Sequence, residues 1–389
     1  MRFIDASGQE YVPTGWLTFN DVLLRPQESC FSSRNDCSIT TGTYLTGSSN
    51  GPLYSMSIPI ISANMDTVTG PEMAIAMFNL GGLGILHRFY SSADEYFKAI
   101  EQVYNHTRHS VINTSRNKEG EVAFSIGCNG SCRYNESKNW IDFVQQVIDT
   151  FPVIRPVVCI DVAHGGMKQV SDTVSQLREK FPRNVCCIIA GNVATGPSAV
   201  KLADAGADVL KVGIGSGSCC STRLVTGHGV PQLSAIMEVR QDLEARGHNN
   251  IGIIADGGIR QSGDMVKAFA VGANAVMLGG LLAGTDEAPG RVEQYNDGSR
   301  KKLYRGQSSR HFLDEIGKDG VASEGVSIEM PYKGSVKDII SELVGGIRSG
   351  LTYSGVSCLE ELYDKSELIE ISHHGWIEST PHIMSNSLS

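Results

Sequence analysis

Short apolar runs alternate with amphipathic segments along most of this chain, and the alternation occurs eight times. The runs are rich in Val, Ile and Leu, as buried parallel strands are. They cover 59–62, 82–87, 122–126, 157–161, 185–190, 209–212, 251–255 and 275–278. Helices are predicted between and after them over 71–79, 93–104, 140–150, 168–180, 197–205, 231–246 and 263–271. Glycine or acidic residues stand at the strand exits, which favours a (β/α)8 TIM barrel with its active-site loops at the C-terminal face.

An open, doubly wound parallel sheet is the alternative fold. The first strand–helix turn lacks the G-x-G-x-x-G pattern of dinucleotide-binding sheets, so the barrel is preferred. A further helix is predicted over 336–345, with a loop starting at Gly346. We see no linker between domains and predict a single catalytic domain over residues 1–389, ending in a flexible polar tail over 373–389.

Charge and cysteine content restrict the partners of this chain. A net charge of -9 and a pI of about 5.6 argue against a broad nucleic-acid surface. No apolar run approaches the roughly 18 residues of a membrane helix, so we expect no membrane association. The 10 cysteines are scattered without paired spacing, which indicates a reduced, cytoplasmic protein.

Polar residues and glycines at the strand exits predict where the site lies. The exits carry Asp66, Asp161, Asn192, Cys220, Asp256 and Gly279-Gly280. Barrels often bind a phosphate at the loops after strands seven and eight, which here are Asp256-Gly257-Gly258 and Gly279-Gly280. The Asp256 carboxylate suits ribose hydroxyls. The alternative is that these glycines serve only the turns of the barrel.

The loop after the sixth strand runs Gly213-Ile214-Gly215-Ser216-Gly217-Ser218-Cys219-Cys220-Ser221-Thr222-Arg223. Its alternate glycines let the backbone come close to a ligand, with carbonyl oxygens toward a cation or N–H groups toward a phosphate. A cysteine with a hydroxyl residue and an arginine close by predicts covalent catalysis by a thiolate on an anionic substrate. A glycine-rich loop with a stray thiol is the alternative interpretation.

Several spaced motifs together resemble the IMP dehydrogenase/GMP reductase family over about residues 17–365. They are Gly215-x-Gly217-Ser218-x-Cys220-x-Thr222-Arg223, Thr226-Gly227-x-Gly229-x-Pro231-Gln232, Asp21-Val22-Leu23-Leu24, Asn64-Met65-Asp66-Thr67-Val68, Asp256-Gly257-Gly258 and Pro331-Tyr332-Lys333-Gly334. The resemblance implies a purine mononucleotide substrate, GMP or IMP. It also implies a thioimidate between the cysteine and purine C2, and a homotetramer or octamer.

The same resemblance implies roles for individual residues. Catalysis is assigned to Cys220, Thr222 and Glu324. The nucleotide is expected at Ser218, Asp256, Gly257, Gly258, Gly279, Gly280, Gly306, Gln307, Ser308, Ser323 and Gly325. A potassium ion (K+) is expected at the carbonyls of Gly215, Gly217 and Cys220, together with Arg223. NADPH is expected at Ser33, Arg34, Arg88, Asp161, Val162, Ala163, Ser349, Gly350, Leu351 and Thr352.

The two activities of this family diverge after the covalent intermediate. A dehydrogenase hydrolyses it with an Arg-Tyr pair on a long flap, whereas residues 310–323 here contain one arginine, Arg310, and no tyrosine. Ala322-Ser323-Glu324-Gly325 resembles the reductases, and a regulatory CBS module has no room after the second strand. The resemblance therefore implies NADPH-dependent reductive deamination of GMP to IMP and ammonia. The alternatives are a CBS-less IMP dehydrogenase, which converts IMP and NAD to XMP, and a nucleotide-binding protein without turnover.

Some positions depart from the reductase pattern. Gly320-Val321 stand where reductases usually carry Tyr-Arg, and Gln307 replaces a common methionine. Arg88 replaces a lysine that contacts the cofactor, and it keeps the charge that favours a 2'-phosphate.

Overall fold

The computed structural model describes residues 1–39, 47–48, 51–52, 56–109, 122–128, 139–151, 156–318 and 320–381. Eight parallel strands form a closed barrel in the order β10-β11-β12-β13-β6-β7-β8-β9. They are β6 (Ile60–Ser62), β7 (Leu83–Leu86), β8 (Ala123–Ile126), β9 (Val157–Asp161), β10 (Cys187–Val193), β11 (Val209–Val212), β12 (Gly252–Asp256) and β13 (Ala275–Leu278). The predicted (β/α)8 barrel is confirmed, and the open sheet is excluded.

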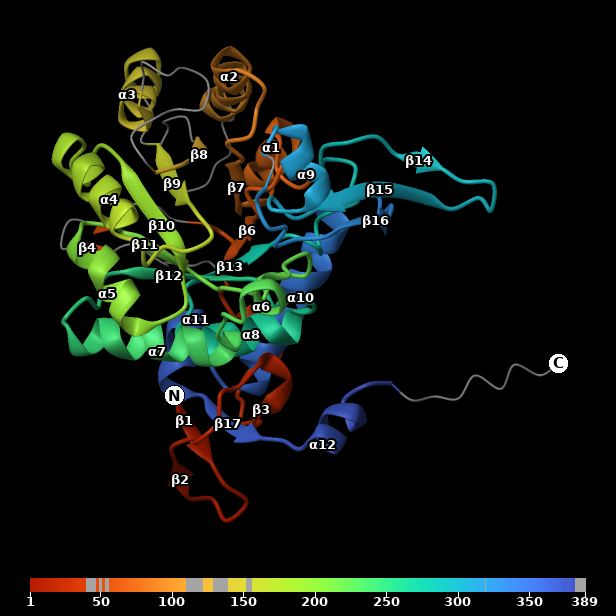
Figure 1. Cartoon of the computed structure of the whole chain (residues 1–389). Helices are drawn as coiled ribbons and strands as arrows, with labels where there is room; N and C mark the ends of the chain where they lie inside the picture. The colour runs from red at the N-terminus through yellow and green to blue at the C-terminus, as the bar shows by residue number, and fades with distance from the viewer. Residues whose placement is uncertain are drawn as a thin grey trace.

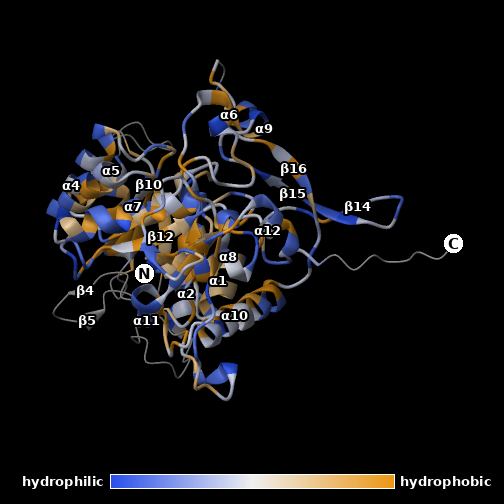
Figure 2. Ribbon diagram, turned by 90° about the horizontal axis from the view of Figure 1, so that it is seen from below, coloured by the Kyte–Doolittle hydropathy of each residue, from blue (hydrophilic) through white to orange (hydrophobic). Residues whose placement is uncertain are grey.

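Helices surround this barrel on the outside (Figure 1). They are α1 (Pro71–Leu80), α2 (Ala93–His109), α3 (Trp140–Thr150), α4 (Lys168–Lys180), α5 (Gly196–Asp204), α7 (Gln232–Ala245), α8 (Ser262–Ala270) and α10 (Val336–Tyr353). Hydrophobic residues gather in the barrel and hydrophilic ones on the outer faces of the helices (Figure 2). This is the amphipathic pattern that predicted the helices.

The fifth predicted strand is wrong in its boundaries. The sequence pattern placed it at 185–190, but Val185 and Cys186 form a turn whose N–H groups bond to the carbonyl of Pro182. Strand β10 starts at Cys187 and continues through Gly191, which pairs with both β9 and β11. The glycine that suggested a strand exit therefore lies inside the ladder.

The predicted loop at Gly346 is also wrong, because α10 continues to Tyr353. Two glycines four residues apart, Gly346 and Gly350, face α8. A Cβ at Gly346 would lie 2.4 Å from the Cβ of Ser262, and one at Gly350 would lie 2.6 Å from a methyl of Val266. These glycines allow two helices to pack closely and do not end α10. Ser349 to Thr352 consequently lie in the last turns of a helix.

Elements outside the barrel were not assigned from the sequence. Segments near the two ends of the chain form one sheet in the order β2-β1-β17-β3, and an antiparallel arm, β14-β15-β16, projects from the side (Figure 1). These strands are β1 (Arg2–Ile4), β2 (Glu10–Tyr11), β3 (Val22–Leu24), β17 (Glu367–Glu370), β14 (Glu293–Gln294), β15 (Arg300–Arg305) and β16 (Ser327–Pro331). The remaining elements are η1 (Phe19–Asp21), η2 (Arg34–Asp36), β4 (Gly47–Ser48), β5 (Gly51–Pro52), α6 (Thr222–Thr226), α9 (Arg310–Glu315), α11 (Leu359–Lys365) and α12 (His373–Glu378).

Helix α12 occupies the start of the segment that we expected to be a flexible tail. Residues 382–389 of that segment lie outside the described residues. Within the described part of the chain, none of the helices has the length and apolar character needed to cross a membrane.

A buried ion cluster stabilises the barrel at the N-terminal end of β11. Asp208 has no solvent exposure and accepts hydrogen bonds from Arg178, Arg183 and the N–H of Ile188. In Asp208→Ala the mostly buried Arg178 loses its counter-charge, so we expect a loss of about 3 kcal/mol. A thermal melt monitored by circular dichroism should show a midpoint several degrees lower.

The control for this variant is Asp172→Ala, which removes an exposed i,i+4 ion pair with Lys168. Such pairs contribute about 0.5 kcal/mol or less, so its melting midpoint should stay close to that of the unaltered protein. Equal shifts in the two variants would contradict the role given to Asp208.

Candidate active site

The C-terminal ends of the barrel strands bring the predicted polar residues to one mouth. Asp161 ends β9, Asn192 lies near the end of β10, and Asp256 ends β12. The cysteine loop leaves β11 between them, and Ser216 Oγ donates a hydrogen bond of 3.2 Å to the carbonyl of Asp256. The loop is thus attached to its neighbouring strand.

Cys220, Thr222 and Glu324 form a continuous chain of hydrogen bonds. The Cys220 thiol donates to Thr222 Oγ1 at 3.1 Å, and that hydroxyl donates to Glu324 Oε2 at 2.8 Å. Cys220 is exposed at the mouth. The three residues assigned to catalysis therefore meet, although Glu324 is about a hundred residues from the loop. A proton can pass between the thiol and the carboxylate through a single hydroxyl.

Backbone contacts hold Glu324 against the cysteine loop. Its carbonyl accepts from the N–H of Ser221 at 2.9 Å, and its own N–H donates to the carbonyl of Ser308 at 3.0 Å. Residues Cys220 and Gly325 form an isolated antiparallel bridge. The carboxylate position is therefore set by main-chain geometry, and this explains why residues so distant in sequence form one site.

The two adjacent cysteines have opposite environments. Cys219 is 3% exposed, and burial raises the pKa of its thiol to about 11. Its carbonyl accepts the N–H of Val326, which fixes the loop from behind. Since the thiolate is the nucleophilic form, burial disfavours reaction at Cys219, whereas the exposed Cys220 is accessible for the nucleophilic role predicted for it.

Residues expected to hold the nucleotide lie around this loop. Ser218 Oγ is 3.0 Å from the hydroxyl of Tyr304, and a Cβ at Gly280 would lie 2.9 Å from Ser218 Oγ. A Cβ at Gly257 would lie 2.9 Å from the N–H nitrogen of Gly217. The loops after β11, β12 and β13 thus touch one another.

Lys333 supports one of these loops from the arm. Its Nζ donates to the carbonyls of Gly280 and Leu281 at 2.6 and 3.0 Å. Burial lowers the pKa of this lysine, and the two carbonyls satisfy its donors. This gives the Pro331-Tyr332-Lys333-Gly334 motif a physical role that the sequence did not indicate.

The segment 306–325 supplies the other expected contacts. Gly306 and Gly325 pack together against the carbonyl of Cys219, and Ser323 Oγ donates to the carbonyls of Ser308 and Gly325 at 3.1 and 3.0 Å. Gln307 Nε2 donates to Asp66 Oδ1 at 2.7 Å. Asp256 lies at the end of β12, and the other ten residues predicted to bind the nucleotide lie in loops at the barrel mouth.

A buried ion network lies beneath the cysteine loop, and its lysine was missed from the sequence. Lys211 Nζ lies 2.9 Å from Asp161 Oδ1 and 3.2 Å from Asp256 Oδ2, and Asn192 Nδ2 donates to Asp256 Oδ2 at 2.8 Å. Burial opposes the charge on Lys211, but the two carboxylates outweigh it and raise its pKa above the usual range. Burial likewise opposes ionisation of Asp161, but Lys211 and then Arg88 outweigh it and lower its pKa.

A second ion pair anchors the segment that follows β15. Arg305, itself 6% exposed, binds Asp66 through two nitrogens and also reaches Glu315 on α9. Asp66 thus joins the first barrel strand to the segment carrying Gln307. The signal available in the sequence was an acidic residue at a strand exit, but its partner lies far along the chain.

Comparison with known proteins agrees with this geometry. A family model described as "IMP dehydrogenase / GMP reductase domain" matches residues 16–382. The chain is 37% identical over 403 residues to an inosine-5'-monophosphate dehydrogenase of Borreliella burgdorferi, covering 94% of this chain and 96% of that protein. It is also 37% identical over 361 residues to GMP reductase 2 of Mus musculus, covering 92% and 94%. The chain belongs to the IMP dehydrogenase / GMP reductase family.

Members of this family are oxidoreductases that use a nicotinamide cofactor and act on purine mononucleotides. Equal identities to a dehydrogenase and a reductase leave the choice to the site. The alignment with the dehydrogenase of Nitrosopumilus maritimus, 33% identical and covering 94% of this chain and 98% of that protein, runs over 481 residues, so that relative carries segments absent here. The Borreliella dehydrogenase aligns without such an excess, so the length of the chain does not discriminate between the two activities.

The residues expected to bind the family's cofactor fall into two groups. Arg88 and Asp161, with Val162 and Ala163, lie at or beside the barrel mouth. Ser349, Gly350, Leu351 and Thr352 lie on α10 in the outer layer of helices, and Ser33 and Arg34 lie at η2, which packs on that helix. The single chain does not bring these two groups together.

The residues expected to hold potassium lie in the cysteine loop and in the short helix α6 that follows it. The carbonyl of Gly217 accepts the N–H of Cys220, and that of Arg223 accepts the N–H of Gly227. Each carbonyl oxygen keeps a second lone pair. Arg223 also donates from Nη2 to the carbonyl of Val230 at 2.6 Å, which turns its charge toward the loop's own backbone. Backbone carbonyl oxygens are the kind of ligand that a potassium ion takes.

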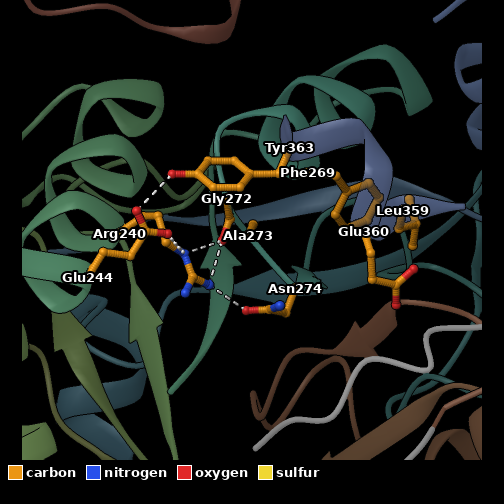
Figure 3. Close-up of a pocket in the computed structure, with 9 residues that line it drawn as sticks. All are labelled: Arg240, Glu244, Phe269, Gly272, Ala273, Asn274, Leu359, Glu360 and Tyr363. Atoms are coloured by element: carbon orange, nitrogen blue, oxygen red, sulfur yellow. Dashed lines mark hydrogen bonds and ion pairs between the residues drawn. The ribbon is translucent and has the colours of Figure 1, made fainter. Parts of the chain in front are cut away.

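A cavity of about 170 Å³ lies at the opposite end of the barrel, between α7, α8 and α11 (Figure 3). Arg240 forms its floor and donates to the carbonyl of Gly272 and to Asn274 Oδ1, while Tyr363 donates to Glu244. Burial lowers the pKa of Arg240. These bonds close the bottom of the barrel, the face where residues serve stability.

The contrast between the adjacent cysteines gives a direct test. With iodoacetamide at pH 8 we expect rapid alkylation of Cys220 and almost none of Cys219, because burial and a pKa of about 11 keep that thiol protonated. Tryptic peptide 212–223 contains both residues, so fragment-ion sequencing must locate the label. Denatured protein should label at both; comparable rates in the native protein would refute the assignment.

Proposed function

We propose that this chain is a GMP reductase. The reaction is GMP + NADPH + 2H+ → IMP + NH4+ + NADP+, and it passes through a thioimidate between Cys220 and purine C2. The observation that carries the proposal is the Cys220–Thr222–Glu324 hydrogen-bond chain, because deamination needs an acid beside the nucleophile.

The same proton is used in the attack of the Cys220 thiol and in the departure of the 2-amino group. As Cys220 attacks C2 of GMP, its proton moves through Thr222 to Glu324. The protonated carboxyl then returns it through Thr222 to the 2-amino group, since an amine leaves poorly as an anion. The C2–N bond breaks, ammonia departs, and the thioimidate remains. NADPH held by the cofactor residues named below would supply a hydride to C2, and departure of the Cys220 thiolate would then release IMP.

The segment between Ser309 and Glu324 supports reduction over hydrolysis. A dehydrogenase requires a base that activates water. Arg310, the single arginine of residues 310–323, lies on α9, where Nη2 donates to the carbonyl of Val321 at 2.9 Å. It has no tyrosine in that segment to work with. Glu324 is then the acid–base group closest to the nucleophile.

A CBS-less IMP dehydrogenase, converting IMP and NAD to XMP, is the second candidate. It is favoured by the 37% identity to the Borreliella dehydrogenase, whose alignment is nearly as short as this chain. In that reaction Glu324 and Thr222 would activate water. The substrate and the cofactor that the protein uses therefore decide between the two candidate activities.

Cofactor and ion binding follow from the same proposal. Arg88, beside Asp161 at the mouth, would supply positive charge for the 2'-phosphate of NADPH. Because the α10 group lies in the outer layer, we propose that a neighbouring copy in a homotetramer or octamer brings its own α10 residues to the mouth. The carbonyls of Gly215, Gly217 and Cys220, with Arg223, would hold K+. We further propose a cytoplasmic location.

A spectrophotometric assay tests the activity. Absorbance of NADPH at 340 nm should fall when GMP is added, and ammonia should appear in equal amount. Cys220→Ala should show no turnover, while Cys219→Ala keeps the nucleophile and provides the control. Accumulation of NADH from IMP and NAD, with no oxidation of NADPH by GMP, would establish the dehydrogenase instead.

Glu324→Gln tests the proton relay. The amide preserves the size of the side chain but cannot carry the proton, so kcat should fall by about 100-fold or more while KM for GMP changes little. Glu329→Gln on β16, the same substitution outside the site, is the matched control. A rise in KM equal to the loss in kcat would indicate a binding role for Glu324 and contradict the relay.

A further inference from the structure

Helix α12 packs beside η1 at the edge of the barrel mouth, and it carries one aromatic residue, Trp376. The guanidinium carbon of Arg260 and the ammonium nitrogen of Lys267 each lie 5.9 Å from the centre of the Trp376 ring. Both cations belong to the segment that follows Asp256-Gly257-Gly258. An aromatic ring attracts cations within about 6 Å of its centre.

Both cations connect this ring to the predicted phosphate loop. Arg260 is two residues from Gly258, and its guanidinium donates to Asn20 Oδ1 on η1 at 2.6 Å. Lys267 donates from Nζ to the carbonyl of Phe19 at 2.8 Å. The ring of Phe19 packs against the loop, since a Cβ at Gly258 would lie 3.5 Å from Phe19 Cε2.

Two positive charges held near each other require compensation. Burial lowers the pKa of Lys267, Asp264 works against this shift, and Arg260 adds to it. Lys267 is 6% exposed, so water does not screen it. Besides the Asp264 carboxylate, the ring of Trp376 and the carbonyl of Phe19 stabilise its ammonium in this position. Backbone bonding of Ile371 to the carbonyl of Asp21 holds α12 in place.

We propose that Trp376 is a positioning residue, through which the C-terminal helix holds the Asp256–Arg260 loop in the conformation that binds the nucleotide phosphate. The proposal rests on the purine-nucleotide site described above and adds a dependence of that site on α12. Trp376 acts through Arg260, Lys267 and Phe19 and does not contact the reacting atoms. Its loss loosens the loop while the Cys220–Thr222–Glu324 chain stays in place.

The test compares Trp376→Leu with Trp376→Phe. Leucine keeps an apolar side chain but removes the aromatic face, whereas phenylalanine keeps that face. In Trp376→Leu we expect KM for GMP to rise about five- to tenfold with kcat within about twofold, and Trp376→Phe should recover most of the affinity. Trp16→Leu is the control, since Trp16 is 64% exposed and lies at the N-terminal segment.

Guanosine, which has the base and ribose of GMP but no phosphate, shows whether an effect on binding depends on the phosphate. Binding measured by calorimetry should weaken for GMP in Trp376→Leu and stay unchanged for guanosine, which lacks the phosphate. Equal weakening of both ligands, unchanged GMP binding, or a parallel fall in kcat and melting temperature would each overturn the proposal.

Two further results are distinguishable from these. If the unaltered protein binds neither GMP nor IMP, the proposed function fails and not the role of the helix alone. If Trp376→Leu does not fold, Asn20→Ala replaces it, because that change removes the oxygen that accepts the hydrogen bond of the Arg260 guanidinium. The same selective loss of GMP affinity is then expected, and unchanged affinity overturns the proposal.

Discussion

The ion network of Asp161, Lys211 and Asp256 is the interaction on which the barrel mouth depends. Its members lie on β9, β11 and β12, and Asn192 on β10 completes it, so four neighbouring strands contribute one side chain each. Lys211 is 3% exposed and could not remain charged in an apolar barrel without these carboxylates. The carboxylates in turn would repel each other without the lysine. The arrangement is stable only when the strands have closed in register.

The network also determines the position of the cysteine loop. Asp256 directs its carboxylate to Lys211 and Asn192, and its carbonyl accepts from Ser216 and Gln232. One residue therefore ties the floor of the mouth to the loop that carries Cys220. Displacing Asp256 would move the predicted phosphate loop and the nucleophile together, which links the stability of the barrel to the geometry of its chemistry.

Most of the barrel could be predicted from the sequence, because its strands and helices follow local patterns of apolar residues. Lys211 was hidden in such a pattern, since an apolar run does not reveal that its lysine points to carboxylates on two other strands. The end of α10 was misplaced because Gly346 suggests a helix end, whereas here it permits contact with Ser262. The sheet that joins β1 to β17 depends on pairing between distant segments, for which a local pattern gives no signal.

The candidate site, like the fold, could be predicted from the sequence only in part. The resemblance to family motifs located the residues of the candidate site. The contacts among these residues depend on the segment 306–325, whose two ends, Gly306 and Gly325, lie side by side at the barrel mouth. A Cβ at Gly325 would lie 3.2 Å from the carbonyl oxygen of Cys219 and 3.3 Å from the Cα of Gly306, so these two backbone segments pack tightly against the cysteine loop.

Because Gly306 and Gly325 are fixed in this way, the residues between them can vary in number and composition without moving Glu324. Cys220 and Glu324, the predicted nucleophile and its acid–base partner, are held at the fixed part, whereas a base for water would have to come from the variable part. One barrel can therefore support deamination or hydrolysis, and the short segment between Ser309 and Glu324 supports the deamination that we propose for this chain.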